Sequence, residues 1–418
     1  MLNEDLVLYI LELLYFSPAG TIEYKTLASS SRISKLWTKP AQNLLFHACH
    51  IHSRETLKSL RRGLTTPRGE SLRRITRVLI LDIAHLTPMF GQVPKSLSEL
   101  DIGPILGLFP NLYELRLILR RISSLSKAAL RLLKAKSVSP IQALVVKIID
   151  DRMDRHGDVL FQLLESFPSV ERVSFDGRGT YRWQSRRTCS QPILSRLREL
   201  RLDLHHTHPS PTGEDFSWLI ANPELLEVLY LADLVLDETF EAFIQQVAPN
   251  LRALRLSSSL RTDLAYLSRW VGLMLRLEEL VIRNDIQGAD CFKVSTDLRP
   301  LLDALPSTVT HLGFTLFSLI EFGRVEEIIN SSLVTDRLAN LTTLTLIITF
   351  RLPRLRLEAF RRGLGVRVLR LFNQTDEDIL FAYVGFRYPP LLLFQRLCFD
   401  RTGEPSHSPA SFPPTLEL

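Results

Sequence analysis

Residues 197–203 read Leu-Arg-Glu-Leu-Arg-Leu-Asp, so that Leu197, Leu200 and Leu202 form an apolar triplet separated by two variable positions and then by one. Thirteen such triplets follow one another, with middle residues at positions 49, 79, 115, 144, 173, 200, 229, 254, 280, 312, 344, 369 and 397. The mean spacing is 29 residues, because 348 residues separate the first and last middle positions over twelve intervals. A period of this length is typical of stacked structural repeats. The sequence therefore predicts one elongated repeat array and not a compact enzyme core.

Each repeat predicts one strand and one helix. The last two apolar residues of a triplet alternate with variable ones, which indicates a short strand. Between triplets the apolar period changes to that of a helix, as in Phe240, Phe243 and Val247. Prolines that end the preceding helix stand two or three residues before five triplets, at 110, 168, 223, 249 and 306. Strands joined by helical crossovers pair in parallel, so we expect an α/β horseshoe with strands inside and helices outside.

This pattern resembles the leucine-rich-repeat family in its longer, strand-plus-helix form, and the resemblance covers residues 45–402. It implies a solenoid whose inner face is a curved parallel sheet. One feature of that family is missing, namely the Asn or Cys three positions after the last apolar residue, which forms hydrogen bonds between turns. The corresponding residues here are Arg120, His205, Ser259, Asp285 and Thr349.

Both ends of the chain depart from the repeat. Residues 1–44 predict three short helices, in which Leu6, Ile10 and Leu13 share one stripe of the first helix. Such short helices cannot form much of a core alone, so this head is interpreted either as a cap for the solenoid or as a docking module. Residues 403–418 are rich in proline and serine and predict a disordered tail.

The head resembles the F-box, the module that binds the Skp-type adaptor of cullin ubiquitin ligases. The residues that carry the resemblance are Leu2, Asp5-Leu6, Ile10, Leu13-Leu14, Leu27-Ala28, Ser31-Arg32, Trp37, Pro40 and Leu44-Leu45-Phe46. The stretch from Arg32 to Phe46 is similar to fungal F-box proteins. Asn3 stands where the family has proline, and the loop from Phe16 to Tyr24 is longer than usual.

The resemblance implies a substrate receptor that catalyses nothing itself and that reaches a cullin through the adaptor. The implied adaptor contacts are Leu2, Leu6, Ile10, Leu13, Leu27, Ser31 and Trp37. The alternative is a leucine-rich-repeat scaffold for protein interactions that is unconnected to ubiquitin, with a head that only caps the solenoid.

Enzymatic and metal-dependent functions find little support in the residues. We recognise no nucleophile elbow, phosphate-binding loop or distinctive pair of carboxylates, so we expect no catalytic residues and no cofactor. The stretch from His47 to His52 has the spacing of metal ligands, but it coincides with the first predicted strand, where Cys49 and Ile51 take core positions. His205, His206 and His208 fall in a predicted surface loop. We therefore predict no metal site.

Charge and cysteine content place the protein in a broad class. The net charge is +6, and the densest basic stretch contains Arg61, Arg62, Arg68, Arg73, Arg74 and Arg77. This stretch is interpreted as a solvated helix face, with a nuclear-import or nucleic-acid patch as the alternative. The four cysteines are widely spaced, and neither a signal peptide nor a long apolar run is evident. We expect a cytoplasmic or nuclear protein that binds neither membranes nor nucleic acid.

The variable residues that flank the second and third apolar positions are expected on the inner face. They alternate in charge, which favours a protein ligand over nucleic acid. Arg201, Tyr230 and Arg255 should lie on three neighbouring strands. The candidate substrate contacts are Arg116, Arg201, Tyr230, Arg255, Arg283 and Arg370, together with Tyr181, Trp183 and Arg187 of the long loop from Asp176 to Pro192.

Overall fold

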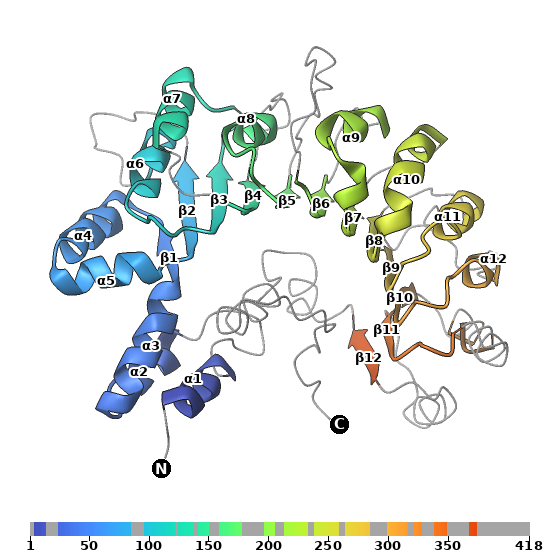
Figure 1. Cartoon of the computed structure of the whole chain (residues 1–418), viewed down its shortest axis with the longest axis horizontal. Helices are drawn as coiled ribbons and strands as arrows, with labels where there is room; N and C mark the ends of the chain where they lie inside the picture. Colours follow the sequence, from blue (N-terminus) through green and yellow to red (C-terminus); the bar gives the residue numbers. More distant parts are fainter. Residues whose placement is uncertain are drawn as a thin grey trace.

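The protein forms one curved parallel sheet with helices on its outer side (Figure 1). The computed structural model describes residues 4–13, 24–84, 96–122, 124–136, 141–149, 159–177, 196–204, 213–232, 238–258, 264–284, 299–316, 322–323, 325–327, 338–348 and 368–373. Among these residues the sheet has 12 strands, whose order in space is their order in the sequence. This arrangement is that of an α/β solenoid, in which each turn adds one strand beside the previous one.

The strands are β1 (Ala48–Ile51), β2 (Val78–Ala84), β3 (Glu114–Arg120), β4 (Ala143–Ile149), β5 (Arg172–Asp176), β6 (Glu199–Asp203), β7 (Val228–Ala232), β8 (Ala253–Ser258), β9 (Glu279–Asn284), β10 (His311–Leu316), β11 (Thr343–Ile348) and β12 (Val368–Asn373). The helices that precede β1 are α1 (Glu4–Leu13), α2 (Tyr24–Ser30) and α3 (Lys35–His47). The helices that follow it are α4 (Arg54–Leu64), α5 (Pro67–Ile75), α6 (Ile102–Leu106), α7 (Lys127–Lys136), α8 (Val159–Ser166), α9 (Gly213–Leu219), α10 (Glu241–Val247), α11 (Leu264–Val271) and α12 (Arg299–Asp303). Short 3₁₀ turns are η1 (Glu99–Asp101), η2 (Pro223–Leu225), η3 (Glu238–Phe240) and η4 (Ala248–Asn250).

The strand register confirms the period found in the sequence. Cys49 of β1 pairs with Leu79 of β2, and Leu79 pairs in turn with Leu115 of β3. The same row continues without a slip through every later strand to Leu369 of β12. The row therefore joins the middle residues of twelve predicted triplets. The thirteenth, at 397, lies outside the described residues, as does the predicted tail.

A single core runs along the array between the sheet and the outer helices. Leu200, Leu229 and Leu280 are fully buried in the register row, and burial of each such side chain contributes about 2 kcal/mol. Aromatic side chains fill the wider space on the helical side, where the Phe216 ring lies 5.4 Å from the Phe240 ring. Larger side chains under the helices than under the strands are consistent with the curvature of the sheet.

Backbone groups connect successive turns at the beginning of each strand. The carbonyl oxygen of Arg198 accepts hydrogen bonds from the N–H groups of Glu227 (2.8 Å) and Val228 (3.0 Å). The Glu227 carbonyl does the same for the next turn, with Arg252 (2.8 Å) and Ala253 (3.0 Å). Because this ladder uses only main-chain atoms, it needs no particular residue type. Successive turns are therefore joined without an asparagine or cysteine three positions after the last apolar residue of the triplet.

The structure of α3 and the start of β1 corrects three details of the sequence interpretation. His47 belongs to helix α3 and not to the first strand, and Phe46 is 36% exposed although the triplet pattern assigns it to the core. Pro40 lies inside α3, which starts at Lys35 and not near the proline. Proline within a helix removes one backbone hydrogen bond, but here the buried Pro40 ring packs in the interior of the head.

The environment of Cys49 leads to a first testable prediction. Burial raises the pKa of this thiol from 9.0 to about 11, so the reactive thiolate is about 100-fold scarcer at pH 8 than in an unfolded chain. In a variant that keeps only Cys49 (Cys189→Ser, Cys291→Ser, Cys398→Ser), we expect iodoacetamide to react about 100-fold more slowly with native than with urea-unfolded protein. Equal rates, measured by mass spectrometry, would show that this thiol is accessible and ordinary.

Candidate interaction surfaces

The first candidate surface is the three-helix head, which has a core of its own. Val7 and Leu11 of α1, Leu27 of α2, and Ala41 and Leu44 of α3 are almost completely buried against one another. The same cluster includes Ala48 of β1 and Val78 of β2. The head is therefore packed both internally and against the first strands of the sheet.

The head also exposes apolar side chains that are not part of this core. Leu6 is 47% exposed, Tyr9 55% and Ile33 64%. Of the ten large apolar residues found exposed in the described part of the chain, six lie within the first 46 residues: Leu6, Tyr9, Tyr24, Ile33, Leu36 and Phe46. Isolated exposed leucines are ordinary, whereas a concentration of them marks an interaction surface.

The predicted adaptor contacts differ in how exposed they are. Leu6 is exposed and Ile10 is half-buried on α1, so a partner can reach them. Leu27 is fully buried and Trp37 packs against the core of the head, so these two side chains hold the head together. Ser31 is half-buried, and its hydroxyl donates a hydrogen bond to the Ala28 carbonyl (2.7 Å). Leu2 and the side chain of Leu13 lie outside the described residues.

The second candidate surface is the inner face of the sheet, which points away from α4–α12. Here Arg201 of β6 is level with Tyr230 of β7, and Tyr230 is level with Arg255 of β8. The predicted Arg-Tyr-Arg row across three neighbouring strands is thus confirmed. Strands in a sheet are about 4.8 Å apart, so the two arginines stand roughly 10 Å apart with the tyrosine between them.

Arginines of this face pair with carboxylates of the same or the neighbouring strand, as Arg120 of β3 does with Asp82 of β2 (2.8 Å). The Arg201 guanidinium pairs with Glu199, two residues earlier on the same strand. The Arg116 Nε lies 2.5 Å from a Glu114 carboxylate oxygen, which repeats the arrangement on β3. Such pairs fix the orientation of the guanidinium groups and leave the face nearly neutral. An alternation of fixed charges favours a protein partner over a polyanion.

A polar cluster continues this face across β8–β11. The Glu279 carboxylate accepts hydrogen bonds from Arg255 Nε (2.5 Å) and Nη2 (3.0 Å), and it lies 3.6 Å from His311 Nδ1. The other ring nitrogen of His311 is 2.8 Å from the Thr345 hydroxyl. Burial acts to raise the pKa of Glu279, but the charge of Arg255 and the hydrogen bonds from His311 and Arg255 outweigh it and hold the pKa below its ordinary value.

The remaining predicted substrate contacts are only partly placed. The backbone of Arg283 on β9 is level with Ser257 of β8, and the backbone of Arg370 on β12 is level with Thr345 of β11. Tyr181, Trp183 and Arg187 lie outside the described residues, so their expected grouping stays a prediction.

Sequence reasoning missed several residues that belong to these surfaces. Tyr9, Ile33 and Leu36 are exposed in the head, although none was expected to contact a partner. A helical period fixes which residues share a stripe, but it does not tell which of two apolar stripes is buried. Lys147 of β4, which lies 3.7 Å from Asp176 of β5, was also missed. The inward position of Lys147 follows from strand parity and could have identified it.

Across the described ranges, no three His, Cys, Asp or Glu side chains gather in a way that could hold a metal ion. None of the helices that the structure describes is long and apolar enough to cross a bilayer. The chain matches no protein-family model and resembles no curated protein closely enough to count as a match.

Proposed function

We propose that this chain is the substrate receptor of a Skp/cullin/F-box-type ubiquitin ligase, in which the head binds the adaptor and the inner face of the sheet binds a protein target. The observation that carries this proposal is the concentration of exposed apolar residues on a head that already has a closed core. Because these side chains contribute little to folding, their exposure is best explained by a partner. Their location coincides with the segment that resembles the F-box.

The inner face supports the second half of the proposal. Arg and Tyr are residue types that dominate binding energy in protein interfaces, and Arg201, Tyr230 and Arg255 lie side by side on it. Their glutamate partners limit the movement of the arginine side chains, which reduces the entropy lost on binding. A receptor needs such a preorganised surface and no catalytic group of its own.

The alternative function is a protein-binding scaffold whose head serves only as a cap. One observation favours it, because Ala48 and Val78 of the first strands belong to the core of the head. The head is therefore packed onto the first two strands, at the end of the sheet where a repeat array needs a capping unit. Capping uses the buried face of the head and docking would use the exposed face, so an adaptor-binding experiment separates the two functions.

The test is direct binding to a purified Skp-type adaptor. We expect the double variant Leu6→Asp, Leu36→Asp to bind the adaptor about tenfold more weakly than the wild type, because charges replace apolar contacts. The matched control is Leu273→Asp, Leu275→Asp, since these leucines are 42% and 69% exposed but lie far along the chain, after α11. Isothermal titration calorimetry gives the affinities, and circular dichroism checks that each variant is folded.

The possible results decide between the two functions. Loss of binding in the head variant, with the control unchanged, supports the ligase receptor. If the wild-type chain does not bind a Skp-type adaptor, or if the head variant binds as well as the wild type, the ligase function is wrong and the scaffold is favoured.

A further inference from the structure

The α4–α5 hairpin and the two residues that follow it carry the whole net charge of the protein. Residues 54–77 contain eight Lys or Arg and two Glu, a net charge of +6, which equals the net charge of the entire chain. The other residues are therefore neutral in sum. A basic region on an otherwise neutral molecule attracts acidic partners and orients their approach.

Several of these cations have no acidic partner within the described ranges. Arg54 lies 3.6 Å from Asp101, and Arg74 lies 2.9 Å from Glu70. Lys58, Arg62 and Arg68 are exposed and make no ion pair with any residue that the structure describes. Their charge is thus available to a partner.

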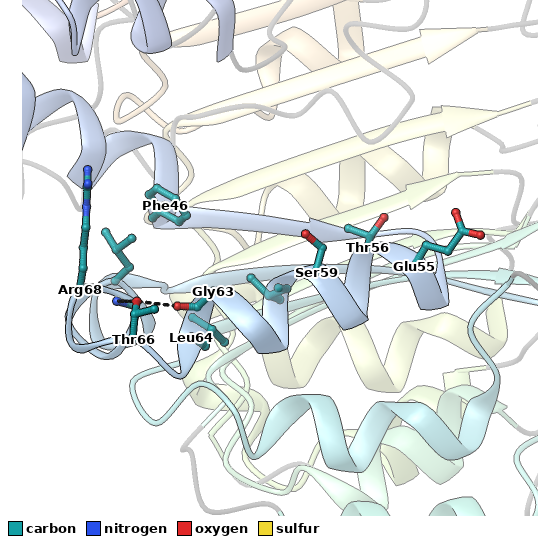
Figure 2. A pocket seen from close by; sticks show the side chains of 11 residues that line it. Phe46, Glu55, Thr56, Ser59, Gly63, Leu64, Thr66 and Arg68 are labelled. Carbon is teal, nitrogen blue, oxygen red and sulfur yellow. Dashed lines mark hydrogen bonds between the residues drawn. The ribbon is translucent and has the colours of Figure 1, made fainter.

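An apolar groove lies beside these cations (Figure 2). It has a volume of about 710 Å³ and is lined by residues of α4 and α5 together with Phe46 at the end of α3. Its apolar lining consists of Phe46, Leu60, Leu64 and Leu72. Ligand-binding pockets in proteins have volumes of about 300–1,000 Å³. The groove is therefore large enough to hold the apolar side chains of a bound segment.

Charged side chains lie at both ends of the groove and along one of its edges. In Figure 2, Arg68 lies at one end of the groove and Glu55 at the other, with Ser59 between them along α4. Arg62 lies three positions after the groove residue Ser59 and four positions after Lys58. Residues three or four positions apart are neighbours on a helix, so Lys58 and Arg62 lie along one edge of the groove. The rim is thus basic along this edge and at the Arg68 end.

We propose that this groove binds an acidic, amphipathic segment of a protein partner, with its apolar side chains inserted and its carboxylates against Lys58, Arg62 and Arg68. The proposal concerns a surface separate from the exposed apolar residues of α1 and does not depend on adaptor binding. Nucleic acid fits less well, because its phosphates would face an apolar floor and Phe46 is the only aromatic lining residue available for base stacking. A membrane fits less well too, because lipid-binding surfaces present their apolar residues outward.

The experiment selects peptides that bind the groove of the full-length protein. A library of random peptides of about four helical turns is panned on wild-type protein after depletion on Ser59→Trp, in which a large side chain fills the groove. Ser59 is exposed, so this change should not disturb the fold. We expect the recovered peptides to be rich in Asp and Glu, with apolar residues three or four positions apart.

Affinities of a recovered peptide, measured by fluorescence anisotropy, then test the charges. We expect the variant Lys58→Glu, Arg62→Glu, Arg68→Glu to bind it at least about tenfold more weakly. The matched control is Lys127→Glu, Arg131→Glu, Lys134→Glu on α7, which reverses three exposed cations elsewhere and should bind as the wild type does. Ser71→Trp, an exposed position of α5 outside the groove, is the control for the bulky side chain.

The proposal is overturned if panning recovers no groove-dependent peptide, or if the recovered peptides are basic or purely apolar. It is also overturned if the α4–α5 charge reversal leaves peptide affinity unchanged. Tight binding of single-stranded RNA or of phosphatidylserine vesicles that survives Ser59→Trp, without any peptide binding, would assign the patch to phosphate recognition instead.

Discussion

Replacing Gly69 by alanine is expected to lower the free energy of unfolding by about 3 kcal/mol, at the upper end of the cost of overpacking. A Cβ atom at this position would lie 2.0 Å from the Gly63 carbonyl oxygen and 2.7 Å from the Leu64 Cα. Both neighbours are backbone atoms, so no side-chain rotation can relieve the overlap. The α4–α5 hairpin would have to open, and the groove between the two helices would change with it.

Gly63 provides a matched control within the same hairpin. A Cβ atom there meets nothing within 4 Å, and alanine is favoured over glycine in a helix by about 0.5–1 kcal/mol. Gly63→Ala should therefore stabilise α4, whereas Gly69→Ala destabilises the hairpin. Repeat arrays can open locally, so hydrogen exchange of residues 54–75 measures the stability of the hairpin itself. Thermal unfolding measures the stability of the whole protein. Similar exchange rates in the two variants would contradict the close packing at Gly69.

The repeat itself could be predicted because one physical rule governs every turn. A leucine in the register row must be buried whatever surrounds it, so Leu200 and Leu344 were identified from spacing alone and are fully buried. Even the weak triplet at 76–81 keeps the register, although its first residue is the polar Thr76. The Thr76 hydroxyl donates hydrogen bonds to the carbonyl oxygens of Phe46 (2.9 Å) and Leu72 (3.2 Å). A hydroxyl that finds such partners can take an apolar position at little cost.

The candidate surfaces were harder to predict because exposure depends on neighbours that are distant in sequence. Phe46 continues the apolar spacing, yet α3 extends past it and turns its ring towards the groove. The groove exists because Gly69 lets α5 approach α4 closely, and a single glycine in a helix carries no sign of such a contact. The ion pairs of the inner face follow from strand parity once the register is known, so that part of the site was accessible from sequence.

The second large effect is expected at Glu279. Its carboxylate is the shared partner of Arg255 and His311, whose side chains are only 13% and 10% exposed. Removal of one member of a buried charged group leaves the others without compensation, which costs about 3–5 kcal/mol. We therefore expect Glu279→Ala to destabilise β8–β10 by that amount, measured by hydrogen exchange of residues 253–316 and by urea unfolding.

Glu227→Ala is the control, because this carboxylate also lies between two arginines of the array but is more exposed. Arg198 is 3.2 Å and Arg252 is 3.9 Å from Glu227, whose side chain is 37% exposed. Exposed ion pairs contribute about 1 kcal/mol or less, so this variant should be nearly neutral. Equal destabilisation by the two substitutions would mean that Glu279 acts through packing and not through its charge.

The pH dependence of the unfolding free energy shows whether Glu279 acts through its charge or through its shape. The folded-state pKa of Glu279 lies below the ordinary value of 4.5, so folding favours the ionised carboxylate. The ionised Glu279 carboxylate therefore stabilises the fold fully above pH 4.5. This stabilisation is lost as the pH falls from 4.5 towards the folded-state pKa of Glu279. Glu279→Gln keeps the size and one hydrogen-bond acceptor but cannot ionise. We expect the difference in unfolding free energy between wild type and Glu279→Gln to be constant near neutral pH and to shrink below pH 4.5, because the wild-type side chain then also becomes uncharged. If this difference in unfolding free energy does not change below pH 4.5, the charge of Glu279 does not stabilise this part of the inner face through Arg255 and His311.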